Sequence, residues 1–247
     1  MPRLKIAVDP GHGGEDRGAK GAKGLQEKDA ALALALALKV VLEDQGFEVL
    51  LTRKEDFFIP LWDRARKANE AGADLFISLH LNAARAKAAK GSEVFFLSLG
   101  QGDSDAAAVA ALENSGVKDR PAPESVLSSI LEDMAQKAYL QESERLAVHL
   151  QTQLNHLGGI KERGVKQAPF VVLRGAAMPA VLVEAAFISN PKEELKLRDS
   201  VFRRKVAESL AQGVRRFFTA GNHTPRRKGA DSNFSHSASY SIGTAPR

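Results

Sequence analysis

Short apolar segments alternate along this chain with segments of helical composition, and this alternation constrains the fold more than any other feature. Strands are predicted at residues 4–8, 47–52, 74–80, 92–98, 170–173 and 180–187. Helices are predicted from Ala31 to Gly46 and over residues 60–72, 146–157 and 199–219. Such alternation is typical of an α/β fold, in which a mostly parallel sheet carries helices on both faces.

The segment ALALALALKVVL, which begins at Ala31, alternates with the period of a strand. We interpret it as a helix, because alanine and leucine are strong helix formers and Gly46 stands where a C-terminal cap is expected. Leu32 and Leu34 then lie on nearly opposite faces. The helix is therefore predicted to pack between two layers.

Residues 103–147 interrupt the alternation of strands and helices. They contain nine acidic and four basic residues, a net charge of −5, and are predicted to form a helical insertion. Four apolar residues recur within it at helical spacing, Leu127, Leu131, Met134 and Ala138. The expected organisation is one domain over residues 1–219 that includes this insertion, followed by a disordered polar tail over residues 220–247.

The composition excludes several classes of protein. The chain has no cysteine, so thiol nucleophiles, disulfides and cysteine-bound zinc are excluded. Its net charge is +5, of which the tail carries +3, and the remaining +2 does not support a nucleic-acid surface. No apolar run approaches the roughly 18–20 residues of a membrane span. The first strand follows Met1 too closely for a signal peptide.

The block VDPGHGGEDRG, residues 8–18, holds one histidine among four glycines. It fails as a dinucleotide fingerprint, because Asp16 stands where the third glycine packs a helix on the sheet. It fails as a P-loop, because Ala19 and Lys20 follow Gly18 where lysine and serine or threonine are required. Nucleotide binding is therefore the weaker alternative, and a loop that closes around a metal is favoured.

Three ionisable residues stand toward the carboxyl ends of predicted strands. His12 follows the first strand, His80 ends the third and Glu184 interrupts the last. Ligand sites of open α/β sheets lie outside this edge, and two histidines with one carboxylate form a common catalytic zinc site. With Glu184 reserved as general base, four acidic residues remain open as the third ligand: Glu15, Asp16, Glu27 and Asp29.

Four blocks, IAVDPGHGGEDRGAKG, GLQEKD, FISLHLNAA and VLVEAAFISNPKEE, occur in this order. Together they resemble the zinc-dependent N-acetylmuramoyl-L-alanine amidases of bacterial cell-wall turnover, over about residues 4–219. The resemblance implies that zinc is bound by His12, Glu27 and His80, and that Glu184 is the catalytic base. It also implies a peptidoglycan substrate, and a place in the periplasm or the extracellular cell wall. A monomer is expected.

The acidic insertion resembles that of the daughter-cell-separation amidases within this family. We expect it to inhibit the enzyme, with Glu113 in the open position of the zinc. The resemblance implies a protein activator that grips the apolar positions of the insertion and withdraws it. A solvated acidic helix without regulatory effect is the alternative.

Two further residues are assigned less specific roles. Arg64 is predicted either to pair with a substrate carboxylate or to lie on a solvated helix face. Asn82 is predicted to brace the metal loop. A degenerate wall-binding module, which holds zinc without hydrolysis, is the alternative to the enzyme, and the presence of Glu184 argues against it.

Overall fold

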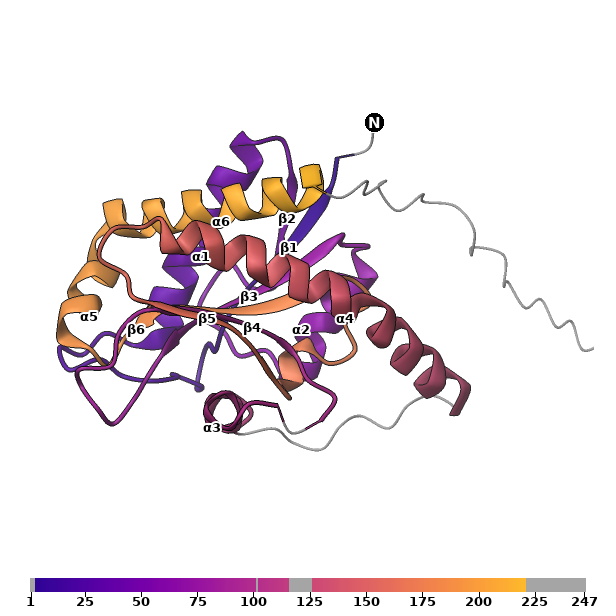
Figure 1. Cartoon of the computed structure of the whole chain (residues 1–247), viewed down its shortest axis with the longest axis horizontal. Helices are drawn as coiled ribbons and strands as arrows, with labels where there is room; N and C mark the ends of the chain where they lie inside the picture. Colours follow the sequence, from indigo (N-terminus) through magenta and orange to yellow (C-terminus); the bar gives the residue numbers. More distant parts are fainter. Residues whose placement is uncertain (1–2, 101, 116–125, 221–247) are drawn as a thin grey trace, which may run out of the picture.

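The computed structural model describes residues 3–100, 102–115 and 126–220, and its centre is a six-stranded sheet in the order β2-β1-β3-β6-β4-β5 (Figure 1). The strands are β1 (Lys5–Pro10), β2 (Glu48–Leu51), β3 (Leu75–Asn82), β4 (Ser92–Leu97), β5 (Glu162–Ala168) and β6 (Ala180–Phe187). The helices are α1 (Glu27–Asp44), α2 (Leu61–Glu70), α3 (Ser104–Glu113), α4 (Val126–Asn155), η1 (Val171–Leu173, a 3₁₀ turn), α5 (Pro191–Arg198) and α6 (Ser200–Ala220).

The sheet is mixed but mostly parallel, as predicted. Strands β2, β1, β3 and β6 run parallel, β4 runs antiparallel to β6, and β5 runs parallel to β4. The amino ends of β4 and β5 therefore meet the carboxyl ends of the other four strands at one edge.

One predicted strand is wrong, and one strand of the sheet was not predicted. The segment 170–173 contains a 3₁₀ turn instead of a strand, and the strand β5 lies just before it. The sequence of β5, ERGVKQA, carries charged and polar residues because it is an edge strand with partial exposure on most positions. Its apolar content was therefore too low to identify it.

Helices cover both faces of the sheet, and each face has its own core. Helices α1, α4 and α6 pack on one face, whose core includes Leu38, Leu150 and Leu210. Helices α2 and α3 and the turn η1 pack on the other, whose core includes Phe76 and Phe95. Figure 1 shows α4 and α6 on one side of the sheet and α3 on the other.

Helix α1 is buried on one side only. Leu34 and Leu38 are inside the core, whereas Leu36 on the other side is 41% exposed. The prediction that this helix packs between two layers is therefore wrong, because no layer formed by the described residues covers its outer face.

The acidic insertion forms two helices, α3 and α4. Helix α4 continues without a break through the predicted boundary at residue 146, and its first turns extend past the edge of the sheet (Figure 1). Met134 is 63% exposed and Ala138 is also exposed, so this part of the apolar stripe is not buried. The side chains of Leu127 and Leu131 and the tail from residue 221 lie outside the described residues. No helix within the described ranges is long and apolar enough to cross a membrane.

Candidate metal centre

Four side chains from distant parts of the sequence meet at the carboxyl edge of the parallel strands. His12, Glu27, His80 and Glu113 each offer one ligand atom, and these atoms all lie within 4.8 Å of one another. They come from the loop after β1, the start of α1, strand β3 and the end of α3. The two histidines lie together at this edge, and of the four acidic residues left open, only Glu27 belongs to this group.

The backbone of the glycine-rich loop turns sharply to present His12. Its φ is +59°, and no other described residue except glycine has a positive φ. The Nδ1 atom of its ring lies 2.9 Å from Oδ2 of Asp16, so a proton held there points Nε2 toward the cluster. A carboxylate behind the ring is the arrangement that orients histidine ligands of metals.

Two glycines of this loop leave room for the cluster. A Cβ atom at Gly11 would lie 2.5 Å from the ring of His80, and one at Gly18 would lie 2.6 Å from the ring of His12. The Gly18 position would also place it 2.8 Å from the Glu27 carboxylate. The glycines therefore let the loop close around these side chains, as predicted.

Glu27 is fixed at both of its oxygens. Oε2 accepts a hydrogen bond of 2.8 Å from the backbone of Ala19, and Oε1 accepts one of 2.9 Å from Leu81. Oε1 also lies 3.2 Å from Nε2 of His12 and 3.3 Å from Nδ1 of His80. Glu27 is thus held with one oxygen facing both histidines.

Glu113, which belongs to the insertion, is the fourth residue of the cluster. Its Oε2 atom lies 2.7 Å from Nδ1 of His80 and 3.3 Å from Nε2 of His12, with the side chain 12% exposed. Helix α3 reaches this position because Ala106 and Ala110 bury their small side chains in the core below it. The asparagine after the helix, Asn114, is anchored to the backbone of Pro169 and Val171.

The cluster has the donor set of a zinc site. Three of its buried atoms, Nε2 of His12, Nδ1 of His80 and Oε2 of Glu113, have no partner with hydrogen-bond geometry among the described residues. The two histidines offer imidazole nitrogens, Glu27 offers a carboxylate oxygen, and Glu113 offers a further oxygen beside them. This set of four fits the tetrahedral coordination that zinc prefers.

Glu184 lies beside the cluster and is completely buried. It pairs in register with His80 across β6 and β3, and both of its carboxylate oxygens lack a hydrogen-bond partner in the described part of the chain. Burial and the neighbouring Glu113 carboxylate raise its pKa well above the ordinary value, although His80 acts against them. A raised pKa suits a group that must both take and return a proton.

The carboxylates around the two histidines raise the pKa of each ring. Burial acts to lower the pKa of His80, but Glu113 and Glu27 outweigh it and raise the pKa to about 10. The pKa of His12 is also raised, because Glu27, Asp16 and Glu113 outweigh its burial. The site therefore attracts positive charge strongly, whether protons or a metal cation supply it.

Two buried arginines hold the backbone of the metal loop from below. Arg53 donates to the carbonyls of Pro10 and Gly11, and Arg64 donates to those of Pro10 and His12. Arg64 also donates to Asp9 at 3.0 Å and is only 1% exposed. Neither the predicted substrate contact nor a solvated helix face describes Arg64, since its guanidinium is enclosed by the fold.

Replacing Arg64 by leucine is expected to destabilise the protein by about 3–5 kcal/mol. The change leaves the Asp9 carboxylate and three carbonyls, those of Ile59, Pro10 and His12, with fewer donors, and an uncompensated buried charge is costly. Urea unfolding measures the effect. Arg66→Leu is the matched control, because Arg66 lies on the same helix with its side chain 58% exposed. Equal stabilities of the two variants would contradict this role.

Asn82 braces a different group from the one predicted. Its Nδ2 atom donates to Oε1 of Glu93 at 2.6 Å, and not to the metal loop. Glu93 is a buried carboxylate on β4 that also accepts from Arg163 and Lys166 of β5. Sequence reasoning missed this group, since β5 was not predicted and nothing local to SEVFF distinguishes Glu93 from an exposed glutamate.

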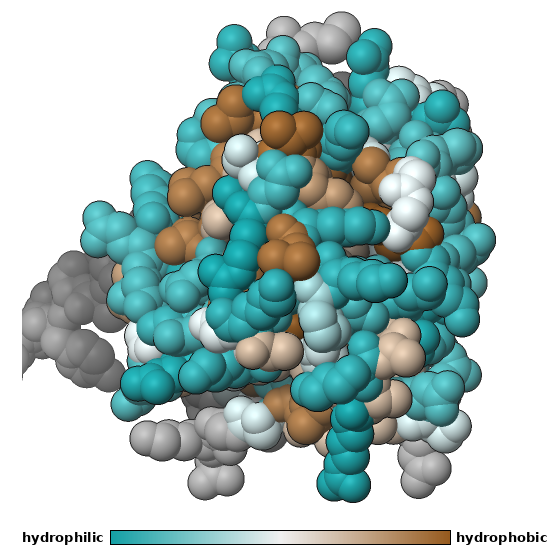
Figure 2. Space-filling model, turned by 90° about the vertical axis from the view of Figure 1, so that its left-hand side faces the viewer, coloured by the Kyte–Doolittle hydropathy of each residue, from teal (hydrophilic) through white to brown (hydrophobic). Residues whose placement is uncertain are grey.

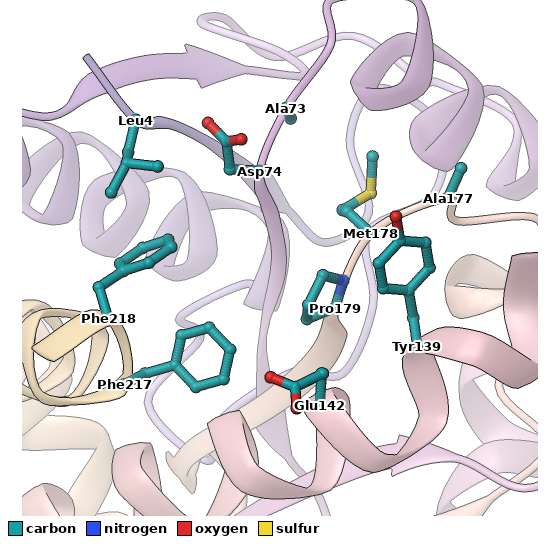
Figure 3. A pocket seen from close by; sticks show the side chains of 10 residues that line it. All are labelled: Leu4, Ala73, Asp74, Tyr139, Glu142, Ala177, Met178, Pro179, Phe217 and Phe218. Carbon is teal, nitrogen blue, oxygen red and sulfur yellow. The ribbon is translucent and has the colours of Figure 1, made fainter. Parts of the chain in front are cut away.

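Two cavities lie at opposite edges of the sheet. One, of about 380 Å³, is lined by His12, Glu27, Asn82 and Glu113 at the carboxyl edge. The other, of about 130 Å³, lies at the amino ends of β1, β3 and β6, between α4 and α6, and contains no histidine (Figure 3).

The face that carries α5, at the left of Figure 1, is mostly hydrophilic with small separate hydrophobic groups (Figure 2).

Comparison with known proteins identifies relatives along most of the chain. The family model described as N-acetylmuramoyl-L-alanine amidase matches residues 6–216. The N-acetylmuramoyl-L-alanine amidase AmiC of Neisseria meningitidis is 40% identical over 226 residues, which are 87% of this chain and 53% of that protein. AmiA of Escherichia coli is 38% identical over 219 residues, 86% of this chain and 75% of that protein. The chain thus spans about half the length of the meningococcal relative.

Solved structures show the same fold. The amidase AmiC2 of Nostoc punctiforme has a TM-score of 0.66 at 27% identity, over 87% of this chain and 97% of that one. An amidase from Clostridium difficile 630 has a TM-score of 0.66 at 27% identity, over 88% of this chain and 98% of that one. The chain therefore belongs to the N-acetylmuramoyl-L-alanine amidase family.

Proposed function

We propose that this chain is a zinc-dependent amidase that cleaves the bond between N-acetylmuramic acid and L-alanine in peptidoglycan, and that its insertion inhibits it. The family match and the cluster of His12, Glu27 and His80 beside Glu184 support the activity. The single observation that carries the proposal is a metal-ligand cluster adjoining a buried carboxylate without a hydrogen-bond partner in the described residues.

His12, Glu27 and His80 would hold the metal, with Asp16 fixing the ring of His12. Zinc, when bound, supplies a Lewis acid that activates water and polarises a carbonyl. Glu184 accepts a proton from the attacking water and later delivers it to the departing amine of alanine. Its raised pKa keeps the proton on the carboxyl group until the amine leaves.

The insertion supplies the inhibitory group. Glu113 faces both histidines in the position that a catalytic zinc leaves open for water or substrate. Glu142, another acidic residue of the insertion, instead pairs with Arg145 at 2.7 Å, on α4. The proposed activator binds the apolar positions of the insertion, of which Met134 and Ala138 on α4 are exposed, and draws α3 away. Peptidoglycan as substrate places the protein in the periplasm or the extracellular cell wall.

Replacing Glu113 by alanine is expected to raise hydrolysis of peptidoglycan by about 10–100-fold. A hydrogen bond to a charged group contributes about 1.5–3 kcal/mol, and its loss raises the open fraction accordingly. Release of soluble peptide from purified peptidoglycan measures the rate. Asp105→Ala, on the first turn of the same helix, is the control. Equal rates for the unmodified chain and Glu113→Ala would contradict the inhibition while leaving the activity unaffected.

Zinc content and hydrolysis together test the activity. About one zinc per chain, with peptide release by Glu113→Ala, is the expected result. Zinc without release by this variant would favour the wall-binding module. Absence of zinc under metal-replete conditions would contradict both.

A further inference from the structure

Arg163 of β5 is held in a fixed orientation by two contacts. Its Nε atom donates to Oε1 of Glu93 at 3.1 Å, and its guanidinium lies 5.0 Å from the centroid of the Phe187 ring. Lys166 donates to the other oxygen of Glu93 at 2.7 Å. Two cations surround one carboxylate, so this group keeps a net positive charge.

The outer side of the guanidinium is available to a ligand. No described residue accepts a hydrogen bond from Nη1 or Nη2 of Arg163, and these atoms are not among the buried ones that lack a partner. The side chain is 29% exposed. The guanidinium is held by the hydrogen bond of its Nε and by the Phe187 ring against its plane, and both Nη atoms are open to solvent. This arrangement suits bidentate binding of a carboxylate.

This arginine lies at the same edge of the sheet as the metal centre. Asn82 lines the cavity that holds the cluster, and its amide donates to Glu93, the partner of Arg163. Phe187, on which Arg163 packs, is paired in register with Asn82. Neighbouring strands lie about 4.8 Å apart, so β5 is about 14 Å from β3. An extended peptide covers about 3.3–3.6 Å per residue, so about four residues bridge this distance.

We propose that Arg163 binds a carboxylate of the peptide part of the substrate, about four residues beyond the scissile amide. The inference rests on the proposed function, which places a peptide in this cavity. A linear peptide that is attached through its N-terminal alanine and is not amidated carries a carboxylate at its other end, so such a substrate supplies the ligand. Glu93 positions the guanidinium. Arg17 also lines the cavity, but it is exposed and no described residue orients its side chain.

Paired substrates test this assignment. Muramoyl peptides of three and four alanines are made with either a free C-terminal carboxylate or a carboxamide, and are hydrolysed by zinc-loaded Glu113→Ala. We expect the carboxylate form to be preferred by about 10–100-fold in kcat/KM, through KM, because a bidentate charged hydrogen bond is lost in the amide. Adding Arg163→Gln removes the preference, and adding Arg163→Lys retains part of it. Adding Arg17→Gln leaves it unchanged.

Three outcomes overturn the inference: equal KM for both substrates, a preference that persists in Arg163→Gln, or one that disappears in Arg17→Gln. Cleavage of neither substrate contradicts the proposed function instead. In that case, calorimetric binding of the free peptides decides the inference: weaker binding of the amide that Arg163→Gln abolishes supports it, and equal binding contradicts it. Circular dichroism of each variant shows whether the fold is retained.

Discussion

Replacing Glu184 by glutamine is expected to lower turnover by about 10²–10⁴-fold while the zinc content stays near that of the unmodified chain. Glutamine has the size and shape of glutamate, so the buried site on β6 keeps its packing. It cannot accept a proton from water or return one to the amine, so general acid–base catalysis is lost. Rates and zinc content are measured on the same preparation, in the Glu113→Ala background.

Glu93 provides the matched control for this prediction. It is also a buried glutamate, and it pairs in register with Glu184 across β4 and β6, but Asn82, Arg163 and Lys166 bind its oxygens. Glu93→Gln should therefore retain far more of kcat than Glu184→Gln. Loss of zinc in Glu184→Gln would make Glu184 a metal ligand, contrary to its proposed role as base.

Replacing either His12 or His80 by alanine is expected to abolish zinc binding and hydrolysis together. Each change removes one of two imidazole ligands, and the remaining donors no longer complete a catalytic zinc site. The fold is expected to survive, because both cores of the sheet are formed by other residues. Alanine adds no new backbone strain at position 12, since histidine already adopts a positive φ there.

Metal analysis, hydrolysis and circular dichroism of the two histidine variants check this expectation. His156→Ala is the control, because His156 is exposed in the turn just after α4 and its ring nitrogen Nδ1 lies 2.6 Å from the backbone carbonyl of Thr152. Full zinc occupancy in His12→Ala or His80→Ala, with the control unchanged, would show that the ligand set is wrong.

Some residues of the candidate site could be found from sequence patterns, whereas Glu27 was singled out among four acidic residues only by the family resemblance. Glu184 stands within an apolar strand and His80 ends another, so both are conspicuous. Glu113 was the first choice among the acidic residues of the insertion, which follows a strand near His80. Glu113 lies within 3.3 Å of a ring nitrogen of each histidine.

Other features depend on tertiary contacts that leave no mark in the sequence. Arg64 lies in an amphipathic helix where arginine normally faces solvent, and it is buried here because carbonyls of the metal loop surround it. Arg53 is also buried, because it donates to carbonyls of the same loop. The strand β5 and the partners of Glu93 were missed because a partly exposed edge strand has a polar composition.

The most direct test of the account is the chemical identity of the ends that are created in peptidoglycan. Zinc-loaded Glu113→Ala is incubated with purified peptidoglycan, and the new amino termini are labelled and identified by mass spectrometry. The account predicts new N-terminal alanine on the released peptides, with glycan strands left uncut, and none of this after Glu184→Gln. Glycan cleavage, new amino termini within the peptide, or no new termini at all would contradict it.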